Sequence, residues 1–184
     1  HKKNGDVLID LHAIELPKDA LHRSDTVLVI EYDEPLKTTR EALVLDPGYQ
    51  STLTPQYAEI MGEDLKYQFN HQWGEGRGYQ VTGWTNNNAK MQWDLRALRD
   101  GVFEIAVVYG ASAPSEGNEF RLSINGQSLN HTVQSTQSEY NPKQFFVGEV
   151  TLEPGKHTLT IKPTTLGEGQ LMNLKQIILT PRVN

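Results

Sequence analysis

"EFRLSINGQSLNHTV", residues 119–133, reads as two strands joined by a tight turn, and this pattern indicates an all-β fold class. From Phe120 to Ile124 apolar residues alternate with polar ones, so the apolar side chains share one face of an extended strand. Asn125 and Gly126 follow, and this pair favours a type I′ turn because both central residues of that turn need positive φ. We therefore predict an antiparallel hairpin at this point.

The same alternation extends in both directions along the chain. Residues 102–110, "VFEIAVVYG", read as a buried strand, and residues 145–163, "FFVGEVTLEPGKHTLTIKP", repeat the pattern around a Pro-Gly turn. Residues 171–181, "LMNLKQIILTP", read as a last strand, and no segment after residue 66 has a persuasive helical period. Strands at short spacing with turn signals between them predict an all-β fold, a β-sandwich.

The first part of the chain has a different organisation. Two strand-like runs, "GDVLIDL" and "DTVLVIEYD", cannot bury a core alone. We therefore predict that residues 1–36 form a strand-pair stub that packs on the sandwich, on another chain or on a further domain. The stretch 34–55 contains Pro35, Pro47 and Pro55, one glycine and several Thr and Ser, and within it residues 37–52 are predicted as a linker or connecting strap. Residues 53–184 are predicted as the sandwich.

Composition narrows the class of function. The net charge of -6 argues against nonspecific binding to nucleic acid or to an anionic membrane, because both need clustered Lys and Arg. Apolar stretches are only strand-sized, which predicts no membrane span. The absence of cysteine excludes disulfides and thiolate metal sites. The chain begins at His1, not Met, so we expect a piece of a larger protein.

Catalytic and metal-binding motifs are not recognisable in the sequence. The carboxylates lie mostly at predicted strand ends and turns, and there is no GxSxG pattern. The glycines of "WGEGRGYQ", residues 73–80, lack the Lys-Ser/Thr of a phosphate loop. His71, His131 and His157 are isolated from other ligand-type residues. We therefore predict no catalytic residue and no cofactor, with a calcium ion held by carboxylates and carbonyls as the open alternative.

Carbohydrate is the ligand class that best fits the remaining residues. A sugar offers an apolar C–H face to an aromatic ring, and hydroxyl groups to amide or guanidinium partners. The predicted loops supply both kinds of group, with Trp73, Arg77 and Tyr79 in the glycine-rich stretch and Trp84 before three asparagines. The alternative for each aromatic ring is core packing, which is our prediction for Trp93 because it lies on an apparent strand.

Residues 53–181 resemble the β-sandwich carbohydrate-binding modules related to families six and thirty-five, which have a jelly-roll, galactose-binding-domain-like fold. The matching features come in order: "LTPQYAEIMGEDLKY", "VTGWTNNNAKMQWDLRALRDGVFEIAVVYGA", "NEFRLSINGQSL", "GEVTLEPGKHTLTIKP" and "LMNLKQIIL". Each piece alone is weak, and their order carries the resemblance. It implies that the partner is an oligosaccharide or glycan.

The resemblance also implies particular binding residues. Trp84 lies in the loop that supplies an aromatic platform, and Asn173 matches an asparagine that often bonds a sugar hydroxyl. Tyr140 lies where the related modules often place a tryptophan. The paired glutamates that help such modules bind a structural calcium are missing, since "TPQYAEIM" offers only Glu59. No metal site is therefore carried over to this chain.

Residues 5–34 are similar to the last strands of the β-sandwich that follows the catalytic barrel in bacterial α-L-fucosidases of the retaining type. This similarity implies the C-terminal part of a secreted or periplasmic glycoside hydrolase, with the parent's catalytic domain as a further partner and no enzyme activity in this chain. The rival interpretation is a structural module that packs against the catalytic domain or mediates association without binding sugar.

Overall fold

The computed structural model describes residues 2–3, 6–7, 42–72, 74 and 76–182. The chain divides into two compact units, residues 1–39 and residues 40–184. In the first unit β1 (Lys2–Lys3) pairs with β2 (Asp6–Val7) in antiparallel orientation. The rest of the predicted strand-pair stub lies outside the described residues.

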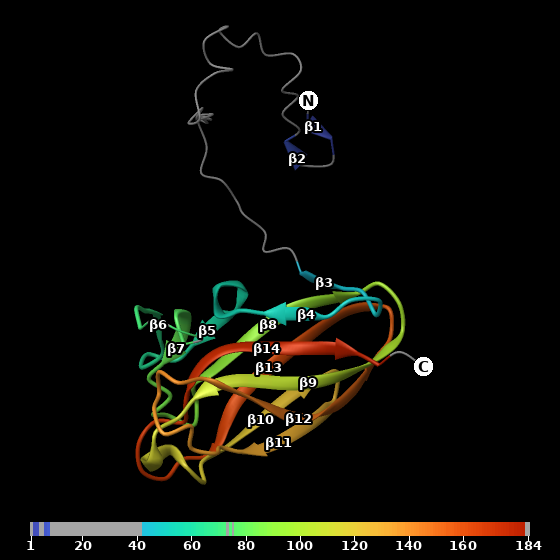
Figure 1. Ribbon diagram of the computed structural model, residues 1–184. Helices are drawn as coiled ribbons and strands as arrows, with labels where there is room; N and C mark the ends of the chain where they lie inside the picture. Colours follow the sequence, from blue (N-terminus) through green and yellow to red (C-terminus); the bar gives the residue numbers. More distant parts are fainter. Residues whose placement is uncertain (1, 4–5, 8–41, 73, 75, 183–184) are drawn as a thin grey trace, which may run out of the picture. The chain divides into compact units, whose positions relative to one another are not determined.

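The second unit is a sandwich of two six-stranded sheets (Figure 1). One sheet has the order β11-β10-β13-β8-β3, with β5 also paired to β8. It consists of β3 (Leu43–Leu45), β5 (Glu59–Met61), β8 (Lys90–Ala97), β10 (Glu119–Ile124), β11 (Gln127–Thr132) and β13 (Gly155–Thr165). The other sheet has the order β12-β9-β14-β7-β6, with β4 also paired to β14.

This second sheet consists of β4 (Ser51–Leu53), β6 (Lys66–Asn70), β7 (Gly78–Thr82), β9 (Gly101–Gly110), β12 (Lys143–Leu152) and β14 (Asn173–Pro181). The helical turns of the described residues are two short 3-10 segments, η3 (Pro55–Tyr57) and η4 (Ala113–Ser115). The predicted all-β sandwich is therefore confirmed.

The hairpin of β10 and β11 forms where its turn residues predict it. Asn125 has φ 50 and Gly126 has φ 79, so both central residues adopt the positive φ that a type I′ turn requires. The ladder begins at once on either side, with Ile124 opposite Gln127 and Leu122 opposite Leu129. The local turn chemistry thus fixes the register of the pair.

A single core fills the space between the sheets. From one sheet Trp93, Leu122 and Ile161 contribute fully buried side chains, and from the other Ile105 and Leu179 do so. These residues come from the apolar positions of the alternating segments, as the period of two requires. The core prediction for Trp93 is confirmed, since its ring is 0% exposed and its Nε1 donates to the Thr54 carbonyl at 3.0 Å.

The predicted strap contributes strands to both sheets. β3 lies parallel to β8, with Leu43 opposite Leu95, and β4 runs antiparallel to β14, with Leu53 opposite Ile177. Leu45 is 0% exposed and belongs to the core. The segment therefore does more than connect two units, because its β-ladders close one edge of the sandwich.

Candidate functional site

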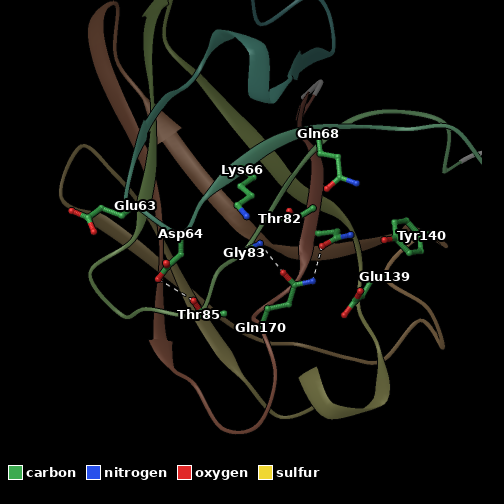
Figure 2. A pocket seen from close by; sticks show the side chains of 11 residues that line it. Glu63, Asp64, Lys66, Gln68, Thr82, Gly83, Thr85, Glu139, Tyr140 and Gln170 are labelled. Carbon is green, nitrogen blue, oxygen red and sulfur yellow. Dashed lines mark hydrogen bonds between the residues drawn. The ribbon is translucent and has the colours of Figure 1, made fainter.

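A cleft of about 580 Å³ opens among the loops that follow β7 and precede β6, β12 and β14 (Figure 2). Lys66 and Gln68 line it from β6, and Thr82 from the end of β7. Tyr140 comes from the loop before β12, and Asn173 is the first residue of β14. Tyr140 and Asn173, two of the residues that the resemblance implies for sugar binding, are thus brought together.

A chain of hydrogen bonds fixes the orientation of Asn173. The Gly83 N–H donates to Gln170 Oε1 at 2.7 Å, which leaves the Gln170 amide nitrogen to donate to Asn173 Oδ1 at 2.8 Å. Since Oδ1 is used, the Asn173 Nδ2 group is the donor that remains, and within the described residues it meets no acceptor. The side chain is only 2% exposed, so the hydrogen-bonding capacity that it retains is confined to the cleft.

Trp84 does not supply an aromatic platform. Its ring is 0% exposed and belongs to the hydrophobic core, and its carbonyl accepts a hydrogen bond from Leu171 N at 2.9 Å. Gly83 before it has φ 83, and a Cβ there would overlap the Asp64 carbonyl. The Gly-Trp pair therefore directs the tryptophan inward, where the ring cannot stack on a ligand, and this corrects the prediction made for Trp84.

Tyr140 remains the aromatic side chain of the cleft, with 36% of its surface exposed. Two glycines hold its segment close to the sandwich. A Cβ at Gly110 would overlap the Glu139 carbonyl, and a Cβ at Gly76 would overlap the Tyr140 carbonyl. The Asn70 Nδ2 group further secures the glycine-rich loop by donating to the Gly76 carbonyl at 2.9 Å.

The other three predicted binding residues are not part of this cleft. Tyr79 lies on β7, and its ring stacks on Tyr67 with centroids 4.7 Å apart. Side chains alternate along a strand, so this pair faces away from Lys66 and Thr82. Arg77 does not line the cleft, and Trp73 lies outside the described residues.

The tyrosine pair has its own electrostatic environment. Partial burial raises the pKa of Tyr67, and the neighbouring phenol groups of Tyr79 and Tyr57 raise it further because two phenolates would repel each other. Both rings of the stacked pair stay substantially exposed, Tyr67 by 41% and Tyr79 by 49%. The pair is therefore a second aromatic surface, separate from the cleft by strand alternation.

Sequence reasoning missed several residues of the cleft. Gln170, which orients Asn173, stands three positions before it in "GEGQLMN", and no motif distinguishes it from other loop glutamines. Lys66 and Gln68 line the cleft only because the polar segment 66–70 forms a strand. Their alternation with Tyr67 and Phe69 is the signal that would have placed them on one face.

In the described part of the chain, His, Asp and Glu side chains form no group of three or more that would suit a metal ion. No helix there has the length and apolarity needed to cross a membrane.

Comparison with known proteins identifies the fold. No protein-family model matches the sequence, and no curated protein matches it. Among solved structures, a family 35 carbohydrate-binding module from Clostridium thermocellum is 13% identical with a TM-score of 0.59, over 71% of this chain and 97% of that module. A GH26-CBM35 β-(1,4)-mannanase from Podospora anserina is 17% identical with a TM-score of 0.57, over 73% of this chain and 28% of that chain.

The mosquito-larvicidal Cry4Aa toxin from Bacillus thuringiensis is 14% identical with a TM-score of 0.59, over 78% of this chain and 25% of the toxin. The chain thus spans about a quarter of the mannanase and of the toxin, and nearly all of the isolated module. At these identities the likeness establishes the fold, which is the β-sandwich of carbohydrate-binding modules. Because the same sandwich also occurs in a toxin, the fold alone does not assign a function to this chain.

Proposed function

We propose that the chain is a non-catalytic carbohydrate-binding module and that its cleft holds one sugar residue of a glycan. The observation that carries the proposal is the meeting of an exposed aromatic ring, Tyr140, with a buried amide donor, Asn173, in one cleft of about 580 Å³. An apolar ring and a few fixed polar groups are what a small-molecule site needs.

The two groups have complementary roles. The Tyr140 ring offers an apolar surface to the C–H face of a sugar, and the Asn173 Nδ2 group donates to a sugar hydroxyl. The hydrogen bonds from Gly83 to Gln170 and from Gln170 to Asn173 already fix the orientation of that amide, so little side-chain entropy is lost on binding. With one partly exposed ring the affinity is weak, and such binding acts by raising the local substrate concentration for a tethered enzyme.

The fold comparisons support this class of function. One neighbour is named as a family 35 carbohydrate-binding module, and another carries such a module on a β-(1,4)-mannanase. We extend the proposal to the parent protein, a secreted or periplasmic glycoside hydrolase resembling an α-L-fucosidase, whose catalytic domain is then a partner of this module. The support for a fucosidase is the similarity of residues 5–34 alone. The sequence upstream of His1 in the parent gene tests it, and a barrel of another glycosidase type would contradict it.

NMR titration of the chain with galactosylated and fucosylated oligosaccharides tests the binding function. We expect shifts at Tyr140, Asn173 and Gln170, with saturation in the millimolar range. Tyr140→Ala should weaken binding by about fivefold or more, because an aromatic contact contributes on the order of 1 kcal/mol. Tyr49→Ala is the matched control, since Tyr49 is 73% exposed and does not line the cleft. An absence of shifts in the cleft at tens of millimolar ligand would contradict the proposal.

The burial of Trp84 favours a second candidate, a structural module without a ligand. In the related modules this loop supplies an aromatic platform, but in this chain its tryptophan, Trp84, is buried in the core. In that case the cleft stays empty in every titration, and the module acts by packing against the catalytic domain or by mediating association. The same NMR experiment therefore separates the two candidates.

A further inference from the structure

The cleft carries an unbalanced charge. Glu63, Asp64 and Glu139 line it together with a single cationic side chain, Lys66. Figure 2 shows Asp64 and Glu63 on one side of the cleft and Glu139 beside Tyr140 on the other, with Lys66 between them. A ligand in contact with Tyr140 therefore lies next to one carboxylate and faces another across the cleft.

The carboxylates are held by neutral partners. Asp64 Oδ2 accepts a hydrogen bond from Thr85 Oγ1 at 3.1 Å, and Glu139 Oε1 accepts one from Ser112 Oγ at 3.1 Å. Among the described residues no ion pair joins Lys66 to either of them. Hydroxyl donors fix the position of a carboxylate but leave its charge in place, so the cleft presents a net negative potential to a ligand.

Asn173 shows independently that the cleft is built for a polar ligand. It is 2% exposed, its Oδ1 is engaged by Gln170, and its Nδ2 group retains a free donor toward the cleft. A ligand hydroxyl at this point would accept the hydrogen bond that the Nδ2 group offers. The acidic side chains thus surround a position that already presents an oriented hydrogen-bond donor.

We propose that the cleft selects a sugar bearing a protonated amino group over the corresponding neutral sugar, and the neutral sugar over the corresponding uronic acid. This inference rests on the proposed carbohydrate-binding function and adds its charge preference. Glu139 and Asp64 attract an ammonium group and repel a carboxylate. The net charge of -6 on the whole chain acts in the same direction at low ionic strength.

Lys66 defines the competing arrangement. Its ammonium group would bind the carboxylate of a uronic acid if the ligand reached it away from Asp64 and Glu139. In that arrangement the uronic acid binds more tightly than the neutral sugar. The affinity of the uronic acid relative to the neutral sugar therefore decides between the two arrangements.

The test is an NMR titration of the chain with galactosamine, galactose and galacturonic acid at low and at high salt. We expect galactosamine to bind about fivefold more tightly than galactose and galacturonic acid about fivefold more weakly, the factor that corresponds to one contact between unit charges in water. Both ratios should shrink at about 300 mM salt, because screening weakens exposed charge interactions.

Glu139→Gln assigns the effect to the cleft. The variant keeps an acceptor for Ser112 Oγ and removes the charge, so the ratio of galactosamine to galactose affinity should fall by about half or more. Asp100→Asn is the matched control, because Asp100 precedes β9 at the end opposite Gly110, which lies against Glu139. A strand of this length spans about 30 Å, and two unit charges that far apart in water interact by only about 0.1 kcal/mol even without salt. The ratio should not change in Asp100→Asn.

The failure of this inference differs from the failure of the proposed function. If galactose binds but galacturonic acid binds equally well or better, or if Glu139→Gln leaves the ratios unchanged, the charge preference is wrong and the binding module stands. If none of the three sugars and none of the oligosaccharides shifts the cleft residues, the proposed function fails and the charge preference fails with it.

Discussion

Trp84 and Trp93 are both 0% exposed, yet their indole N–H groups have different surroundings. Trp93 Nε1 donates to the Thr54 carbonyl at 3.0 Å. Trp84 Nε1 is buried and has no hydrogen-bond partner in the structure. A buried donor without a partner loses its hydrogen bonds to water and forms none in the protein. The packing of the Trp84 ring therefore stabilises the core, while its unsatisfied N–H group destabilises it.

This contrast predicts different responses to the same substitution. Trp→Phe at either position removes a similar ring volume, but Trp93→Phe also breaks the hydrogen bond to the Thr54 carbonyl, which then keeps only the Tyr57 N–H as a donor. We expect Trp93→Phe to lower the free energy of unfolding by about 1 kcal/mol more than Trp84→Phe does. Urea denaturation followed by circular dichroism measures both values. Equal losses would show that the Thr54 hydrogen bond contributes nothing.

The sequence could not settle the direction of the Trp84 ring. The neighbouring residues, a glycine before it and asparagines after it, are compatible with an exposed loop or with a turn into the core. The outcome depends on Gly83, whose positive φ and close approach to Asp64 involve a segment nearly twenty positions away in sequence. Trp93 was predictable because strand alternation places it on the apolar face without any distant contact.

At the scale of elements, the cleft depends on how closely the segment before β12 approaches the end of β9. Gly110 is the last residue of β9, and a Cβ there would overlap the Glu139 carbonyl. Asn173 lies opposite Gly110 in the ladder of β14 with β9. One glycine thus brings Glu139 and Tyr140 to the strand end that carries the amide donor.

Gly110→Ala should therefore weaken sugar binding by displacing Glu139 and Tyr140, without removing any group that contacts the sugar. The added methyl forces the Glu139–Tyr140 segment outward, so we expect sugar binding to weaken severalfold and the free energy of unfolding to fall by about 1–3 kcal/mol. Gly167→Ala is the matched control, since its Cβ would meet only Asn118 Oδ1, at 3.4 Å. NMR titration and urea denaturation of the two variants provide the measurements. Unchanged binding in Gly110→Ala would mean that the segment is not positioned by this contact.

The elements themselves were predictable to different degrees. The β10–β11 hairpin follows from Asn125-Gly126 and from alternation, both of which are local. The sequence predicts a glycine-rich loop where β7 forms, because the glycine and polar residues of this segment mask its alternation. Tyr79 therefore lies on a strand and not in a loop. Tyr140 and Asn173 were named through resemblance, while their meeting with Gln170 depends on three distant segments that no local pattern relates.

At the scale of the whole molecule, both sheets include strands from the segment 37–52, which the sequence predicts as a strap. β3 extends one sheet along β8, and β4 extends the other along β14. Leu45 and Leu53 are buried to 0% and 1% exposure, so these short strands contribute to the core as well as to the ladders. The physical boundary of the sandwich therefore precedes Leu43, and the predicted boundary at residue 53 divides a layer of the core.

Two truncations test this boundary. A chain that starts at Arg40 keeps β3 and β4, and we expect it to unfold in one cooperative urea transition. A chain that starts at Leu53 loses β3, most of β4 and the buried Leu45 side chain. Because emptying one buried leucine position alone costs about 2–5 kcal/mol, we expect this shorter chain to lose at least about 3 kcal/mol relative to the longer one. Equal midpoints would show that the strap is dispensable, and an unfolded chain from Arg40 would show that the sandwich needs the residues before it.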